Sequence, residues 1–255
     1  MSLTEIVQLE GHIQSIYLAV YPDKLLLLDG CCRPDVPLVL DYIKHTLQRP
    51  ITDLKVVVTH MHADHAGGAL LFRQATGCQI VSSDKSNQWY AGVGGRVMHF
   101  IDTSLAYWVA RRLGRPTKRL WYPAHLTPDI TVVDGQRLPH FEDWQVLVTA
   151  GHTDRDLSLY HPQTQRIYTA DLIIKLRHKF VAPVPIYLPQ VYRESLKRVK
   201  QLNPEQVMMA HGGAKYVEPE VFDQLIQRVP ERPVTVKATI EHKLFWWFKR
   251  PKPNL

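Results

Sequence analysis

The sequence predicts a layered α/β fold. Short apolar runs of strand length alternate with segments of helical periodicity, and polar side chains follow directly after several of these runs. The chain has 255 residues, of which 45% are hydrophobic and 22% are charged. This composition excludes a mainly disordered chain, and the length is ample for a closed core. No stretch approaches the ~18 consecutive apolar residues that a transmembrane helix needs.

The first part of the chain shows the alternation most clearly. A β-hairpin is expected over 13–30, because turn residues at 21–24 separate two apolar runs. The elements expected next are a helix, a buried strand, a helix and a strand, over 36–48, 56–59, 67–76 and 79–82.

The segment 85–126 differs from its surroundings, because it is aromatic and basic rather than strand-like. It contains one expected helix, over 98–113, and we interpret the whole segment as an inserted helical lid. Its candidate substrate-binding wall residues are Trp89, Tyr107, Trp108 and Trp121. Packing in the core is the alternative role for each of them.

Strands resume after the lid. They are expected over 130–133, 145–149, 157–160, 166–170 and 206–210, with a helix over 191–202 before the last of them. We expect one domain over 1–240, followed by a separate aromatic and basic tail over 241–255.

A cluster of metal-binding residue types follows the buried strand at 56–59. His60, His62, Asp64 and His65 stand in the run Thr59–Gly68, between that strand and the next helix. Open α/β sheets bind ligands at the carboxyl ends of their strands. Alternation places His60 and His62 on one side, while Asp64 and His65 are displaced around the turn toward a second site. Imidazole and carboxylate groups suit Zn, Fe or Mn.

Three later strand ends repeat this pattern. His152, Asp171 and His211 each follow a predicted strand, and glycine adjoins both histidines. Taken singly, each is more typical of a cap or a turn. Together with the first cluster they supply five histidines and two aspartates at one edge, which is what two adjacent metal ions need.

These motifs resemble the metallo-β-lactamase superfamily of metal-dependent hydrolases, over about residues 13–213. The resemblance implies a four-layer αβ/βα sandwich with its metals at one edge. It implies a first metal held by His60, His62 and His152, a second held by Asp64, His65 and His211, and a bridge formed by Asp171.

Asp171 places the resemblance in the glyoxalase II-like and lactonase-like branch, because antibiotic-hydrolysing members lack an aspartate there. Two departures leave the substrate open. Thr153 is followed by Asp154 rather than by the proline and histidine usual in glyoxalase II, and Ile174 stands where acyl-homoserine lactonases have a tyrosine.

The activity implied is a dinuclear hydrolase, in which a metal-bridging hydroxide cleaves an ester, thioester or lactone bond. Zinc is the metal expected first, with iron or manganese as alternatives. Asp64 is the candidate catalytic residue, because it could orient the nucleophile as well as bind the second ion. The competing interpretations are a phosphodiesterase, an iron-dependent oxidoreductase similar to sulfur dioxygenases, and a regulatory protein that retains its metals.

The charge and the composition of the chain favour some classes of partner over others. Lys and Arg number 31 against 24 acidic residues, which gives a formal charge of +7. A small-molecule substrate with a hydrophobic or anionic part is expected, and a homodimer is an open alternative. Nucleic acid is not favoured, because the basic runs lack interleaved aromatic residues. Three cysteines and no apparent secretory signal favour a cytoplasmic protein.

The tail raises a separate question. Phe245–Phe248 are four consecutive aromatic residues, flanked by Lys243, Lys249 and Arg250. Such a segment suits either the interface of an anionic membrane or a protein surface. We favour protein packing, since no other stretch of the sequence is clearly directed to a membrane.

Overall fold

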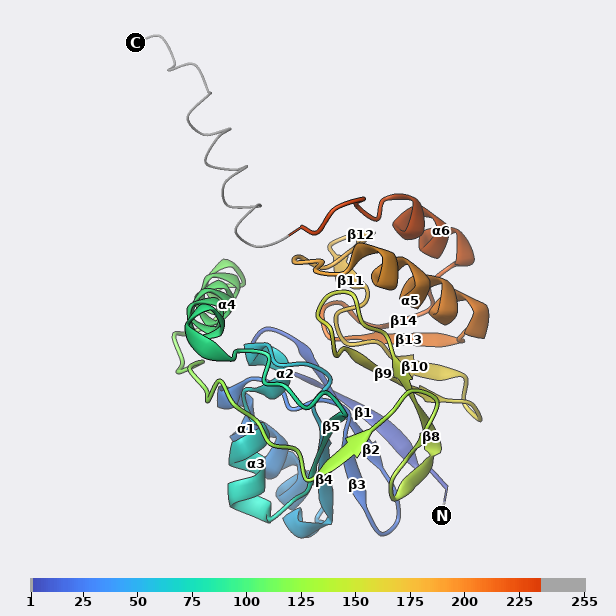
Figure 1. Ribbon diagram of the computed structural model, residues 1–255. Helices are drawn as coiled ribbons and strands as arrows, with labels where there is room; N and C mark the ends of the chain where they lie inside the picture. Colours follow the sequence, from blue (N-terminus) through green and yellow to red (C-terminus); the bar gives the residue numbers. More distant parts are fainter. Residues whose placement is uncertain (1, 235–255) are drawn as a thin grey trace.

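Two six-stranded β-sheets pack face to face in the computed structural model, which describes residues 2–234 (Figure 1). The strands of the first sheet lie in the order β1 (Glu5–Glu10), β2 (Ser15–Val20), β3 (Leu25–Leu27), β4 (Leu54–Val57), β5 (Ile80–Ser83) and β6 (Ile130–Val132). β1 to β3 are antiparallel, whereas β3 to β6 run parallel. Their parallel carboxyl ends therefore meet at one edge of the sheet.

The second sheet is mostly antiparallel. Its strands lie in the order β14 (Gly213–Lys215), β13 (Gln206–Met209), β10 (Arg166–Tyr168), β9 (Leu157–His161), β8 (Phe141–Val148) and β7 (Arg137–Leu138). Only β10 and β13 pair in parallel.

Helices cover the outer face of each sheet and complete four layers. On the first sheet these are α1 (Val36–Asp41), continued by a π turn at Tyr42–Thr46, and α3 (Ala69–Thr76). On the second they are α5 (Pro189–Leu202) and α6 (Pro219–Gln227). The remaining elements are α2 (Ala63–Ala66), α4 (Gly92–Arg112), the hairpin β11 (Ile174–Leu176) to β12 (Lys179–Val181), and two short 3₁₀ turns at Arg33–Asp35 and Ile51–Asp53. The predicted αβ/βα sandwich is confirmed.

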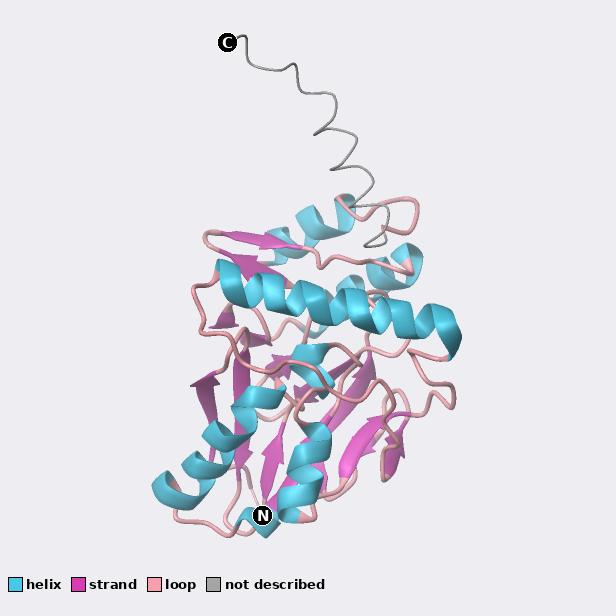
Figure 2. Cartoon of the chain, turned by 90° about the vertical axis from the view of Figure 1, so that its left-hand side faces the viewer, coloured by secondary structure: helices cyan, strands magenta, loops and turns pink. Residues whose placement is uncertain are grey.

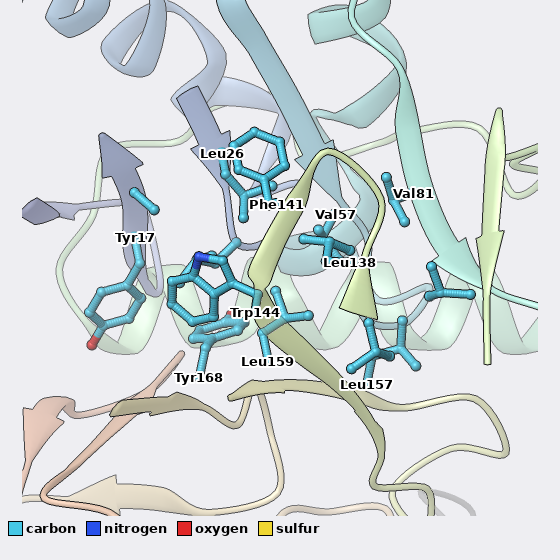
Figure 3. Close-up of a cluster of buried hydrophobic side chains, with 14 of the residues drawn as sticks. Tyr17, Leu26, Val57, Val81, Leu138, Phe141, Trp144, Leu157, Leu159 and Tyr168 are labelled. Atoms are coloured by element: carbon cyan, nitrogen blue, oxygen red, sulfur yellow. The ribbon is translucent and has the colours of Figure 1, made fainter. Parts of the chain in front are cut away.

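The main core lies between the two sheets (Figure 3). Leu26 and Val57 project from the first sheet toward Trp144 and Leu159 of the second, and all four are fully buried. Burying side chains of this size stabilises the fold by about 1.5–3 kcal/mol each. Trp144 keeps its polar atom satisfied, because its Nε1 donates a hydrogen bond to the Tyr21 hydroxyl at 2.8 Å.

The segment between β5 and β6 contains α4, the longest helix of residues 2–234, in the place predicted for a helical lid. Figure 2 shows this helix lying across the front of the molecule. It begins at Gly92 rather than at 98. The sequence did not predict the first turns because glycines, here at 94 and 95, are unfavourable inside helices. The structure explains Gly95, since a Cβ there would lie only 2.2 Å from the backbone of Tyr90. Close packing therefore requires glycine inside this helix.

Several other elements differ from the prediction. The sequence pattern did not indicate β1, α2, β7, α6, β14 or the β11–β12 hairpin. The expected helix over 67–76 is α3, which begins at Ala69. Within residues 2–234, no helix combines the length and the apolar character that crossing a bilayer requires. The tail predicted over 241–255 lies outside the described residues.

Candidate metal centre

The seven predicted metal-binding side chains converge where four strands end. His60 and His62 lie in the loop after β4, and Asp64 and His65 lie in α2, which follows directly. The loops after β8, β10 and β13 carry the three others, His152, Asp171 and His211. All seven atoms fall into two groups, and the atoms of each group lie within 4.8 Å of one another.

The first group consists of three imidazole nitrogens and one carboxylate oxygen. His62 Nδ1 lies 3.1 Å from His60 Nε2 and 3.0 Å from His152 Nε2. Asp171 Oδ2 lies 3.6 Å from the same nitrogen of His152. The three nitrogens therefore face one point from three sides.

The second group lies beside the first and shares Asp171 with it. Asp64 Oδ2 lies 3.0 Å from His211 Nε2 and 3.7 Å from His65 Nε2. Asp171 Oδ1 lies 3.4 Å from His65 Nε2 and 3.5 Å from His211 Nε2. Asp171 thus places one oxygen in each group, which is the arrangement of a bridging carboxylate.

The outer ring nitrogens of three histidines are fixed by hydrogen bonds. His152 Nδ1 donates to the carbonyl of Pro185 at 2.6 Å, and His211 Nδ1 donates to the carbonyl of Ile13 at 3.1 Å. His65 Nδ1 donates to Asp29 Oδ2 at 2.6 Å. Such bonds set the tautomer of the neutral, metal-binding form of each ring, in which Nε2 presents a lone pair to the centre.

The electrostatics of the site fit a cation at each group. Burial, followed by the nearby His152, lowers the pKa of His62 to about 3, so its imidazole is neutral and able to bind a metal. Burial alone would raise the pKa of Asp171, but His65, His211 and His152 hold it well below its usual range.

Two buried atoms support the same conclusion. Within residues 2–234, neither His65 Nε2 nor Asp171 Oδ1 has a hydrogen-bond partner, although both are shielded from water. Unpaired buried polar atoms and converging lone pairs are costly, and a divalent cation in each group would satisfy them. The donor set therefore fits the two metal ions that the motifs suggested.

Asp29 is a site residue that the sequence analysis missed. It is buried two residues after the end of β3. Its Oδ1 accepts hydrogen bonds from the backbone N–H groups of Gly30 and Thr59. Its Oδ2 accepts from the Thr59 hydroxyl at 2.7 Å, the Tyr168 hydroxyl at 2.9 Å and His65. Asp29 therefore fixes the orientation of His65. An aspartate directly after an apolar run was the one signal available in the sequence.

Two glycines allow the backbone to pack closely around the centre. A Cβ on Gly68 would lie 2.6 Å from the carbonyl oxygen of Gly30. Gly151, immediately before His152, has a φ of 140° and would bring a Cβ within 2.4 Å of Tyr192. Gly68 has a φ of −91°, so close approach rather than backbone conformation is the reason for glycine there.

The lid helix contacts the centre through Asp102. Its Oδ2 lies 3.6 Å from His62 Nε2, the nitrogen that points away from the first group. Tyr90 donates a hydrogen bond to the same oxygen at 3.0 Å. The Tyr122 hydroxyl, 3.5 Å from that of Tyr90, donates to the carbonyl of Met61, next to His62. The lid therefore helps to orient the imidazole of His62, a candidate metal ligand.

Replacing Asp102 with leucine is expected to weaken metal binding by about 10- to 100-fold, because His62 loses the acceptor that faces its outer nitrogen. Competition with a chromogenic chelator measures the change. Asp102→Asn keeps an acceptor oxygen and is the matched control, for which a smaller loss is expected. Wild-type affinity in the leucine variant would contradict this role.

A cavity of about 730 Å³ opens onto the two groups. His62, Asp64, His152, Asp171 and His211 lie in its wall. The apolar part of the lining comes from the lid, from the β11–β12 hairpin and the residues after it, and from the loop between β1 and β2. It includes Ile13, Leu105, Ala106, Val109, Leu113, Ile174, Leu176, Val181 and Val184. Arg115, Lys175 and Lys215 add positive charge to the lining.

The four aromatic residues predicted as walls do not line this cavity. Trp89 packs between Tyr187 and the Arg155 guanidinium, and the Tyr107 hydroxyl accepts a hydrogen bond from the Leu120 backbone. Trp108 and Trp121 are 53% and 42% exposed. The lid does line the cavity, but with a different face of α4, through Asp102, Leu105, Ala106 and Val109, and with Leu113 directly after the helix.

Comparisons with known proteins agree with the motifs and the geometry. The model of the metallo-beta-lactamase superfamily matches residues 9–211. A curated relative, the probable metallo-hydrolase YqjP of Bacillus subtilis (strain 168), is 25% identical over 176 residues, which cover 62% of this chain. The matched region spans 54% of that relative, about half of its length.

Solved structures show the same fold. ST1585 from Sulfolobus tokodaii, described as an archaeal metallo-beta-lactamase superfamily protein, superposes with a TM-score of 0.63 at 18% identity, covering 93% of each chain. TTHA1623, solved in a di-iron-bound form, gives a TM-score of 0.56 at 22% identity and covers 89% of this chain and 99% of its own. Because the family model matches most of its length, this chain belongs to the metallo-β-lactamase superfamily, a relationship that supports a hydrolase.

Proposed function

We propose that this protein is a dinuclear metallo-hydrolase that cleaves an ester, thioester or lactone bond in a small molecule with an apolar acyl part. The observation that carries the proposal is the pair of ligand groups that share Asp171 and line a largely apolar cavity. A buried site of this shape suits an acyl chain, with a few polar groups to fix its orientation.

His60, His62 and His152 would hold one ion, Asp64, His65 and His211 the other, and Asp171 both. We propose zinc, although the same donor set also accepts iron or manganese. When bound, two such ions lower the pKa of water toward neutrality and polarise the oxygen of the bond to be cleaved.

The chain's own residues position the reactants. Asp64 lies in the cavity wall, where it can accept a hydrogen bond from an attacking water molecule and orient it. Leu105, Ala106 and Val109 would hold the acyl part and exclude water from it. Lys175 and Lys215 would attract an anionic group at the other end of the substrate.

A panel of substrates tests the reaction class. Holoenzyme is assayed with p-nitrophenyl esters of increasing chain length, acyl thioesters, lactones and bis(p-nitrophenyl) phosphate. Turnover of the acyl substrates above the phosphodiester supports the proposal. Preferential turnover of the phosphodiester, oxygen-dependent turnover of a persulfide substrate with iron bound, or no turnover of any substrate would overturn it.

Narrowing the cavity should change acyl preference. Val109→Phe is expected to raise KM for long-chain esters by about tenfold or more and to leave short-chain esters nearly unchanged, because each displaced CH₂ is worth about 0.8 kcal/mol. Trp108→Ala, on the same helix but away from the cavity, is the matched control and should leave both values at the wild-type level. Equal effects of the two variants on chain-length preference would contradict the assignment of this wall.

A further inference from the structure

The outer face of the lid helix carries an exposed apolar stripe. Val93, Val97, Phe100 and Trp108 recur on α4 at helical spacing, with Ser104 between the last two, so they share one face. Val93 is 82% exposed and Phe100 is 60% exposed. Among the residues that the structure describes, no other helix or strand lies in front of this helix in Figure 2. Exposed apolar residues gathered in this way indicate an interaction surface.

The same segment holds nearly all of the protein's excess charge. Residues 85–126 contain a single acidic residue, the buried Asp102. Against it stand Lys85, Arg96, Arg111, Arg112, Arg115, Lys118 and Arg119. The lid therefore carries +6 of the formal +7 of the chain. Among the ion pairs of residues 2–234, only that of Arg115 with Glu10 involves one of these cations.

The stripe continues to the mouth of the cavity. Leu105 is 37% exposed and also lines the cavity. Across the mouth, Leu176 and Val184 are more than half exposed and line it too. The β11–β12 hairpin that bears Leu176 contributes Lys175, Arg177 and Lys179 and no acidic residue. Both sides of the mouth thus combine exposed apolar side chains with positive charge.

We propose that the outer face of α4 and the β11–β12 hairpin dock on an anionic lipid bilayer. Apolar side chains would enter the interface while the surrounding arginines and lysines meet acidic headgroups. The cavity mouth would then face the membrane. Resting on the proposed function, the substrate class is narrowed to lipophilic acyl compounds that partition into the bilayer.

The other possible partners fit this surface less well. A second copy docked through the same face would bring two strongly positive segments together. Nucleic acid would satisfy the cations, and Phe100 and Trp108 could stack on bases, but the aliphatic Val93 and Val97 would then stay exposed to water. Protein packing was favoured for the aromatic tail because no other stretch of the sequence was clearly directed to a membrane. With the lid as a second element suited to a membrane, that reason no longer applies.

Co-sedimentation of the full-length holoenzyme with vesicles tests the docking. Vesicles of phosphatidylcholine alone are compared with vesicles that also contain phosphatidylserine. Binding is expected only to the anionic vesicles. It should weaken with added salt, because headgroup attraction is screened within a Debye length. No preference for anionic vesicles at low salt would overturn the proposal.

Two double variants assign the binding to the lid. R111E/R112E and F100S/W108S are each expected to reduce the partition coefficient by about tenfold or more. K44E/R137E makes the same charge change at exposed sites away from the lid, and Leu38→Ser removes an exposed apolar side chain there. Both controls should bind like wild type. Lid variants that bind as well as their controls would overturn the proposal.

Further readouts separate the alternatives. Sedimentation velocity without lipid reports self-association, and competition by a single-stranded oligonucleotide reports nucleic-acid binding. A lid-dependent dimer, or displacement from vesicles by the oligonucleotide at physiological salt, would contradict a membrane role. Hydrolysis of a water-soluble short-chain ester is measured in parallel and should be unchanged in F100S/W108S. Vesicle binding without any ester hydrolysis would overturn the proposed function but leave the docking intact.

Discussion

Replacing Asp171 with alanine is expected to abolish hydrolysis and to lower the metal content of the purified protein. Its two oxygens lie in different ligand groups, 3.4 Å from His65 Nε2 and 3.6 Å from His152 Nε2, so one substitution removes a ligand atom from both. It also removes one of only two carboxylates among the seven candidate ligands, leaving the cations less neutralised. A fall in kcat of about 1000-fold or more is expected.

Elemental analysis and steady-state kinetics on the same preparations check this result. Asp171→Asn keeps the size of the side chain and one carbonyl oxygen, so it should retain more metal than the alanine variant. Asp23→Ala, at an exposed turn, controls for handling of the protein and should match wild type. An alanine variant with full metal content and full activity would refute the assignment of Asp171 as the bridge.

Replacing Asp29 with alanine is expected to produce the largest loss of stability among single substitutions at the site. Five donors converge on its carboxylate, including His65 Nδ1 at 2.6 Å and the Tyr168 hydroxyl at 2.9 Å. A buried donor that loses its partner costs about 1–3 kcal/mol. Since water or side-chain movement would satisfy some of these donors, we expect the free energy of unfolding to fall by about 3–5 kcal/mol.

Chemical denaturation of the metal-loaded protein measures this loss. Thr59→Val and Tyr168→Phe each remove a hydroxyl donor and retain the carboxylate, so each should cost about 1 kcal/mol. The substitutions also differ in their effect on metal. Asp29→Ala should weaken binding at the second group, because His65 loses the bond that sets its tautomer. A free energy of unfolding within about 1 kcal/mol of wild type would contradict the structural role of Asp29.

The convergence of the seven candidate metal ligands could be predicted from the sequence because much of its signal is local. His60, His62, Asp64 and His65 are close in the chain, and His152, Asp171 and His211 each follow a recognisable buried strand. Parallel strands bring such ends to one edge whatever the details of packing. Asp29 escaped notice because its main partner, His65, lies 36 residues away, and a lone aspartate after an apolar run is equally typical of a turn or a helix cap.

The cavity wall could not be predicted for a different reason. α4 carries apolar side chains around its whole circumference, with Val97 and Phe100 toward solvent, Leu105 and Val109 toward the cavity, and Ala106 and Ala110 buried. Hydrophobic periodicity therefore leaves the rotation of this helix about its axis undetermined. Only packing of the lid against the centre, through contacts such as that of Asp102 with His62, shows which face lines the cavity.

Metal reconstitution tests the central claim, a two-metal hydrolytic centre, most directly. Protein stripped with a chelator is titrated with zinc, while bound metal and ester hydrolysis are measured at each step. We predict that activity is lost on stripping, returns as metal is added, and reaches its plateau at two ions per chain. Full activity in the stripped protein, or a plateau at one ion with no second ion bound, would contradict the account.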